Sequence, residues 1–140
     1  MTNSDDRRDS GTVLIVEDHT LMRQALREFV QDAFPHCDFR EAADGASALD
    51  ACDAHTPKLI LMDIGLPDAD GIELTSRLKT LYPETHVIIV SYRAGECYAR
   101  RAFAAGARAY VVKEHISTDL VPAVAEALGT PPTAIMGISW

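Results

Sequence analysis

Three short runs of the sequence consist almost entirely of apolar residues, and they restrict the fold more than any other feature. They are TVLIV at 12–16, LILM at 59–62 and HVIIV at 86–90. A strand with one face in water alternates apolar and polar residues, whereas a continuous apolar run fits a strand that is buried on both faces. Strands of that kind occur mainly in parallel sheets that helices cover on both sides. The sequence therefore favours an α/β fold.

Segments with apolar residues at helical spacing separate these strands. We expect helices over residues 20–33, 46–54, 72–81 and 96–105, and a last helix that Ser117 or Thr118 caps and that runs to Leu128. Two further strands are expected at 37–42 and 107–112, and the charges in the first of these indicate an edge strand. Five strand–helix units joined by right-handed crossovers predict a doubly wound, flavodoxin-like parallel sheet in the order 2-1-3-4-5.

The length of 140 residues suits one domain. We expect a disordered lead-in over residues 1–11, the domain over 12–129, and a tail or truncated linker over 130–140. The net charge of −8, from 13 Lys and Arg against 21 Asp and Glu, argues against direct nucleic-acid binding. No apolar run approaches the roughly 20 residues that a membrane span needs.

The cysteines and histidines give no sign of a structural metal site. The three cysteines, Cys37, Cys52 and Cys97, are widely spaced and form no CxxC motif, which predicts reduced thiols in a cytoplasmic protein. The five histidines are scattered and are not paired at the spacing of zinc ligands.

Polar side chains follow four of the five expected strands, at the points where the strands end. They are Glu17 with Asp18, then Asp63, Ser91 and Lys113. Taken singly, each has an ordinary explanation as a cap, a turn residue or a solvated side chain. Because the carboxyl ends of parallel strands meet at one edge, these residues should converge, with the three acids beside the switch point between the first and third strands. The joint pattern indicates a ligand site.

The residue types predict the chemistry of this site. Three neighbouring carboxylates repel one another, and Mg²⁺ is a cation that accepts carboxylate ligands while it keeps several waters. Lys113 adds a positive charge on a long stem and Ser91 adds a hydroxyl donor, so the edge can receive an anion. Asp63, which ends the central strand, is the best candidate for a nucleophile in phosphoryl transfer.

At these positions the sequence resembles the receiver domains of response regulators in two-component signalling. The resemblance covers roughly residues 12–129 and includes a highly specific loop, LILMDIGLPDADG at 59–71. It also resembles the branch whose receivers often precede a LuxR-type helix-turn-helix output domain. The other matching stretches are VLIVEDH at 13–19, IIVS at 88–91 and AFAAGARAYVVKE at 102–114.

The resemblance implies a signalling switch that a sensor histidine kinase phosphorylates. Phosphorylation would change the protein-interaction surface, with a possible homodimer, and would control transcription through an output domain absent from this chain. The chain would be a phosphoacceptor with at most slow self-catalysed phosphotransfer and autodephosphorylation, and so not an enzyme. The implied site consists of the phosphoacceptor Asp63, the Mg²⁺ ligands Glu17, Asp18, Asp63 and Gly65 (backbone carbonyl), the phosphoryl-binding Ser91 and Lys113, and the switch residue Tyr110.

Some positions depart from the family or have a second interpretation. Tyr92 stands where the family usually has a small residue, and its ring could shield the phosphoryl group, hinder its formation or point outward. Arg93 and Gly65 occupy positions that in the family tune the access of water, and Gly65 offers no side chain for that role. Tyr110 could equally be a half-buried residue of the last strand.

Three other functions remain open at this point. A small aspartyl-phosphate hydrolase would have a second aspartate where this chain has Gly65. A flavodoxin-like cofactor binder would have a phosphate-binding loop at 17–19, where the acids here would repel a phosphate. A receiver-like module that binds proteins without being phosphorylated is favoured only by Tyr92.

Overall fold

The computed structural model describes residues 11–133, in which strands and helices alternate along the chain. The strands are β1 (Thr12–Val16), β2 (Asp38–Ala42), β3 (Leu59–Met62), β4 (His86–Ser91) and β5 (Ala109–Val112). The helices are α2 (Thr20–Ala33), α3 (Gly45–Ala54), α4 (Gly71–Leu81), α5 (Glu96–Ala104) and α6 (Ile116–Leu128), the last preceded by the 3-10 turn η1 (Lys113–His115).

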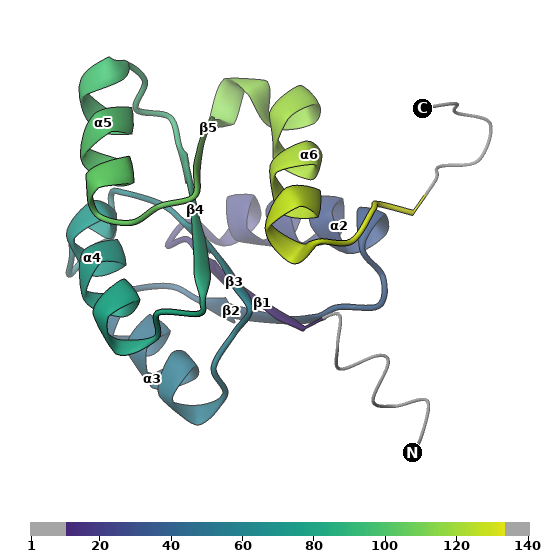
Figure 1. Ribbon diagram of the computed structural model, residues 1–140, viewed down its shortest axis with the longest axis horizontal. Helices are drawn as coiled ribbons and strands as arrows, with labels where there is room; N and C mark the ends of the chain where they lie inside the picture. The colour runs from purple at the N-terminus through teal and green to yellow at the C-terminus, as the bar shows by residue number, and fades with distance from the viewer. Residues whose placement is uncertain (1–10, 134–140) are drawn as a thin grey trace.

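The strands form one parallel sheet in the order β2-β1-β3-β4-β5, which confirms the predicted topology. In the register of the two central strands, Val13 lies opposite Leu59 and Val16 opposite Met62. Helices α2 and α6 cover one face of the sheet, and α3, α4 and α5 cover the other (Figure 1). Charged β2 lies at the edge, as its sequence predicts.

Every residue of β1 and β3 is buried, which explains why these strands are continuous apolar runs. Successive side chains of a strand point to opposite faces. Val13 and Ile15 accordingly pack with α2 and α6, whereas Leu14 and Val16 pack on the face that α3 and α4 cover. The two cores fix β1 and β3 from both sides, and with them the residues that follow these strands.

Two predicted boundaries near the end of the chain are wrong. Helix α6 begins at Ile116 and has no side-chain cap, so Ser117 and Thr118 lie in its first turn. The reason is the 3-10 turn η1, which carries the backbone directly from β5 into the helix without the extended residue that a hydroxyl cap needs. Strand β5 begins at Ala109, two residues later than expected, after Gly106 turns the chain with a φ of 105°.

The ends of the chain lie largely outside the described residues. The expected disorder of residues 1–10 and the structure of residues 134–140 are therefore untested. Just before the second of these segments, the amide of Thr133 donates to the carbonyl of Ala33 at the end of α2 (2.7 Å). Over residues 11–133, none of the helices combines the length and the apolar character that crossing a membrane requires.

Helix α3 has a reciprocal cap at its start, which gives a first prediction. The Asp44 carboxylate accepts the amide of Ser47 (2.8 Å), and the Ser47 hydroxyl lies 3.3 Å from the amide of Asp44. Asp44→Ala removes the cap and should lower the free energy of unfolding by about 1 kcal/mol, measured by urea denaturation. Asp50→Ala, at an exposed position in the same helix, should cause no loss. Equal losses for both variants would mean that the cap contributes nothing.

Candidate functional site

The predicted site residues lie along the carboxyl edge of the sheet. Hydrogen bonds of the parallel ladder continue one residue past the central strands, because the Glu17 amide donates to Ala42 and the Asp63 amide donates to Val16 (both 3.0 Å). These bonds hold the two carboxylates side by side at the point where the strand order reverses. The rigid sheet therefore sets the positions of Glu17 and Asp63.

The structure brings the three acids together. Glu17, Asp18 and Asp63 each offer one carboxylate oxygen, and these oxygens lie within 4.8 Å of one another. Glu17 is buried, Asp63 is partly buried and Asp18 is exposed, so the cluster opens toward solvent on the side of Asp18. The donor set consists of oxygen atoms only, which suits a hard cation such as Mg²⁺. The Gly65 carbonyl stays a predicted fourth ligand.

Lys113 reaches the acidic cluster from the end of β5. Its Nζ lies 2.5 Å from Oε1 of Glu17 and 3.5 Å from Oδ2 of Asp63. The side chains of Lys113 and Glu17 are only 5% and 2% exposed, so this is a buried ion pair that a second carboxylate extends. One cation thus compensates part of the negative charge, and the site remains acidic.

The environment of Asp63 disfavours its ionised form. Burial, and next the negative charge of Glu17, raise the pKa of the Asp63 carboxyl above its ordinary value. Lys113 opposes this shift, as does the Ile64 amide, which donates to Oδ1 of Asp63 (2.9 Å). A bound cation would relieve the repulsion between the carboxylates.

The loop after β3 is tied to α3 and α4 by contacts that the sequence did not reveal. The Asp68 carboxylate accepts the amides of Gly45 (2.7 Å) and Ala46 (3.0 Å) at the start of α3. Asp70 caps α4 by accepting the amides of Ile72 and Glu73. Both carboxylates therefore stabilise the starts of helices. From the sequence alone, their position in an aspartate-rich loop beside the acidic cluster would have suggested additional cation ligands.

Arg23 is a second residue that the sequence did not single out. Its guanidinium donates to the backbone carbonyl of Glu17 (2.8 Å) and pairs with Glu41 (2.8 Å), which also pairs with Arg27. These contacts join α2 and β2 to the loop that carries two of the acids. In the sequence, the only sign of this role is the position of Arg23 in the helix expected just after the EDH segment at 17–19.

Ser91 and its neighbours form the other side of the site. Ser91 is buried, and its hydroxyl accepts the amide of Arg93 (3.1 Å). The Tyr110 hydroxyl donates to the carbonyl of Arg93 (2.6 Å), and burial raises the pKa of Tyr110. The ring of Tyr92 does not point away from the site, because its centroid lies 4.9 Å from Nζ of Lys113. A Cβ placed on Gly65 would lie 3.4 Å from a guanidinium nitrogen of Arg93, so Arg93 borders the same loop.

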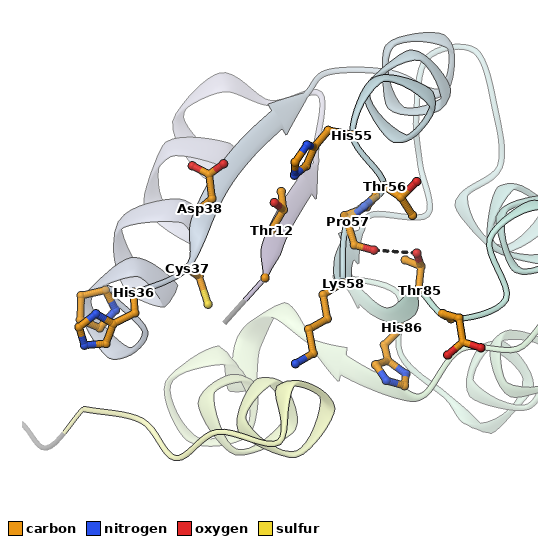
Figure 2. Close-up of a pocket in the computed structure, with 13 residues that line it drawn as sticks. Thr12, His36, Cys37, Asp38, His55, Thr56, Pro57, Lys58, Thr85 and His86 are labelled. Carbon is orange, nitrogen blue, oxygen red and sulfur yellow. Dashed lines mark hydrogen bonds between the residues drawn. The ribbon is translucent and has the colours of Figure 1, made fainter. Parts of the chain in front are cut away.

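A cavity of about 990 Å³ lies at the opposite, amino-terminal edge of the sheet (Figure 2). Residues at and before the starts of the strands line it, among them His36, His55 and His86. The Thr85 hydroxyl donates to the carbonyl of Pro57 across its wall (2.7 Å). None of the predicted site residues lines this cavity. The clustered charges, rather than the volume of a cavity, therefore mark the candidate site.

A family model described as the response regulator receiver domain matches residues 13–125. The matched segment starts in β1, ends in α6 and contains all the strand-end residues described above. The chain belongs to this family. Its likeness to two-component signalling proteins is thereby confirmed.

Individual relatives agree with the family model. The chain is 34% identical to the chemotaxis protein CheY of Halobacterium salinarum over 83% of its length and 95% of that protein. It is 39% identical to a putative transcriptional regulator of Pseudomonas aeruginosa, over 84% of this chain but only 56% of that protein. A crystal structure of a LuxR-family response regulator from Aurantimonas sp. superposes with a TM-score of 0.79 at 30% identity, covering 86% of this chain and 87% of that one. The chain thus spans about half the length of the transcriptional relative and nearly all of the chemotaxis protein.

Proposed function

We propose that the chain is a phosphorylation-dependent switch, in which Asp63 accepts a phosphoryl group from a sensor histidine kinase with the help of Mg²⁺. The observation that carries the proposal is the position of Asp63, within reach of two further carboxylates and 3.5 Å from Lys113. Few arrangements of side chains both attract a divalent cation and offer a separate positive charge to an anion. Membership of the receiver family supports the same function.

In this reaction a carboxylate oxygen of Asp63 attacks phosphorus, and the bond between phosphorus and the histidine nitrogen breaks. Glu17 and Asp18 would hold the cation together with Asp63. When bound, Mg²⁺ would supply positive charge that offsets the charge of the phosphoryl oxygens. Lys113 would neutralise one phosphoryl oxygen, and the Ser91 hydroxyl would donate a hydrogen bond to another.

The hydrogen bonds of Ser91 suggest how phosphorylation would change the surface. If the Ser91 hydroxyl turns to the phosphoryl group, it no longer accepts the Arg93 amide in its present geometry. The backbone carbonyl of Arg93 accepts a hydrogen bond from the Tyr110 hydroxyl, so the loop before α5 and the Tyr110 side chain would move together. A changed surface on α5 and β5, and a homodimer of the phosphorylated form, are proposed readouts.

The relatives and the composition of the chain support a proposal about its wider role. Because the match covers only about half of the length of several transcriptional relatives, we propose control of transcription through an output domain outside this chain. The net charge of −8 supports a role without direct nucleic-acid contact by this chain. Cys37, Cys52 and Cys97, which all lie within residues 11–133, are not joined in disulfides, and this supports a cytoplasmic location. The chain acts as a phosphoacceptor rather than an enzyme in this proposal.

A receiver-like module that is never phosphorylated is the second candidate function. The contact between Tyr92 and Lys113 favours it, since the ring occupies one side of the lysine that should meet the phosphoryl group. The complete set of acids, hydroxyl and lysine at one edge favours the phosphorylated switch.

Incubation with acetyl phosphate separates the two functions. With Mg²⁺, intact-mass analysis should show a single phosphoryl adduct on the chain, and replacing Mg²⁺ with EDTA should remove it, because the crowded carboxylates then repel the donor. An adduct that forms equally well in EDTA would contradict a metal-assisted site. The absence of any adduct would favour the unphosphorylated module.

A further inference from the structure

Among the described residues, two carboxylates and one aromatic ring lie around the ammonium of Lys113. Glu17 and Asp63 provide carboxylate oxygens at 2.5 and 3.5 Å, and the ring of Tyr92 lies 4.9 Å away. The Lys113 side chain is 5% exposed, whereas Tyr92 is 60% exposed. The aromatic ring therefore lies on the outer side of the ammonium, between it and solvent.

This contact has the geometry of a cation–π interaction. An ammonium within about 6 Å of an aromatic centroid is attracted by the negative face of the ring. A lysine side chain has a flexible four-carbon stem, and at the rim of a site its ammonium can otherwise turn toward water. The ring of Tyr92 opposes that movement and keeps the charge of Lys113 beside the carboxylates.

The backbone that carries Tyr92 is itself fixed. The next residue, Arg93, donates its amide to Ser91 (3.1 Å) and accepts the Tyr110 hydroxyl on its carbonyl (2.6 Å). The guanidinium of Arg93 also lies 5.9 Å from the centroid of the Tyr98 ring. Tyr92 is thus an exposed ring on a restrained backbone, which allows it to act on Lys113.

The geometry points to Tyr92 as a positioning residue for Lys113: its ring holds the ammonium next to Asp63, where it meets an incoming phosphoryl oxygen. This inference rests on the proposed function and names a residue at a position where the family usually has a small side chain. A large residue that only blocks the site would slow phosphorylation, so its removal would speed the reaction. A positioning ring has the opposite effect, because its removal leaves Lys113 less often in place.

A first experiment detects the contact without any phosphoryl transfer. An aromatic ring over Lys113 should shift the NMR resonances of the protons next to its Nζ upfield. We expect the shift in the unaltered, metal-free chain and in Tyr92→Phe, which keeps the ring. It should disappear in Tyr92→Leu, which keeps apolar bulk without a π face. The absence of a shift in the unaltered chain would overturn the inference.

A second experiment measures the rate at which acetyl phosphate and Mg²⁺ phosphorylate the chain. In this reaction the bond from phosphorus to the acetyl oxygen breaks, the bond to the Asp63 carboxylate forms, and acetate leaves with the electron pair. Tyr92→Leu should react about two- to fivefold more slowly than the unaltered chain, the range expected for an exposed cation–π contact. Tyr92→Phe should react at the unaltered rate. An equal or faster rate in Tyr92→Leu would overturn the inference.

A double-mutant cycle tests whether Tyr92 acts through Lys113. In a chain that already carries Lys113→Met, the further change Tyr92→Leu should leave the rate unchanged. An effect of the same size in both backgrounds would mean that the ring acts on the site directly, and would overturn the inference. If circular dichroism finds Lys113→Met unfolded, the comparison of Tyr92→Phe with Tyr92→Leu decides alone.

The failures of the inference and of the proposed function have different signatures. If the unaltered chain forms the adduct and Tyr92→Leu forms it at the same rate, only the role of Tyr92 is wrong. If the unaltered chain forms no adduct at all, the proposed function is wrong, and the role of Tyr92 in phosphorylation is wrong with it.

Discussion

Replacing Asp63 with asparagine should abolish the Mg²⁺-dependent phosphoryl adduct completely. Asparagine keeps the size of the side chain and its place at the end of β3, but its neutral amide is a poor nucleophile and a weaker cation ligand. Intact-mass analysis after incubation with acetyl phosphate measures the outcome. Asp50→Asn, at an exposed position on α3, makes the same chemical change away from the site and should leave the adduct unaltered.

The loss of the adduct in Asp63→Asn should not come from unfolding. Burial and Glu17 raise the pKa of Asp63 above 3.8, so the folded state binds the proton of this carboxyl more tightly than the unfolded state does. The ionised carboxylate therefore lowers stability at neutral pH, and this loss disappears as the pH falls through the raised pKa. In EDTA at pH 7 the variant should need at least as much urea to unfold as the unaltered chain. An adduct that persists in a folded Asp63→Asn would assign the nucleophile to another residue.

The sheet could be predicted from the sequence because burial on both faces leaves a clear pattern. The runs TVLIV and LILM became β1 and β3, and the expected order of the five strands is correct. The start of α6 could not be predicted in the same way. Ser117 and Thr118 look like caps, but a 3-10 turn between β5 and α6 places them inside the helix.

The placement of Glu17, Asp18, Asp63 and Lys113 along one edge of the sheet follows from topology. Any parallel sheet in this order brings its carboxyl ends to one edge, whatever the rotamers of the side chains. Topology does not fix which oxygen Lys113 approaches most closely, and here it is an oxygen of Glu17 rather than of Asp63.

The direction in which the Tyr92 ring points could not be predicted from the sequence either. That direction depends on the side-chain torsion of Tyr92 and on the hydrogen bonds that fix the backbone of Arg93, which are tertiary properties. The same holds for Asp68, whose carboxylate reaches the start of α3 across 23 positions of sequence. Contacts of this kind depend on packing, which a pattern of residue types does not encode.

Gly71→Ala should be the most destabilising small substitution near the site, with a loss of about 3 kcal/mol or more in the free energy of unfolding. A Cβ at this position would lie 2.0 Å from the backbone oxygen of Asp63 and 2.8 Å from Cα of Ile64. Both atoms belong to the backbone that follows β3, and the Gly71 amide is bonded to the Ile64 carbonyl (2.8 Å). The added methyl group therefore displaces either α4 or Asp63 itself. Urea denaturation measures the loss, and acetyl phosphate labelling should fall with it.

Gly65→Ala is the matched control for this prediction, because it adds the same methyl group to the same loop. Within residues 11–133, neither Gly65 nor Gly71 is among the glycines with positive φ, so backbone strain does not separate the two variants. The Cβ of Gly65→Ala would meet only a guanidinium nitrogen of Arg93 at 3.4 Å, at the end of a flexible side chain. Its free energy of unfolding should stay within about 0.5 kcal/mol of the unaltered chain. Since alanine favours helix at the first residue of α4, helix propensity would by itself make Gly71→Ala the more stable variant. A large loss confined to Gly71→Ala must then come from the close approach of α4 to the backbone of Asp63, the proposed phosphoacceptor.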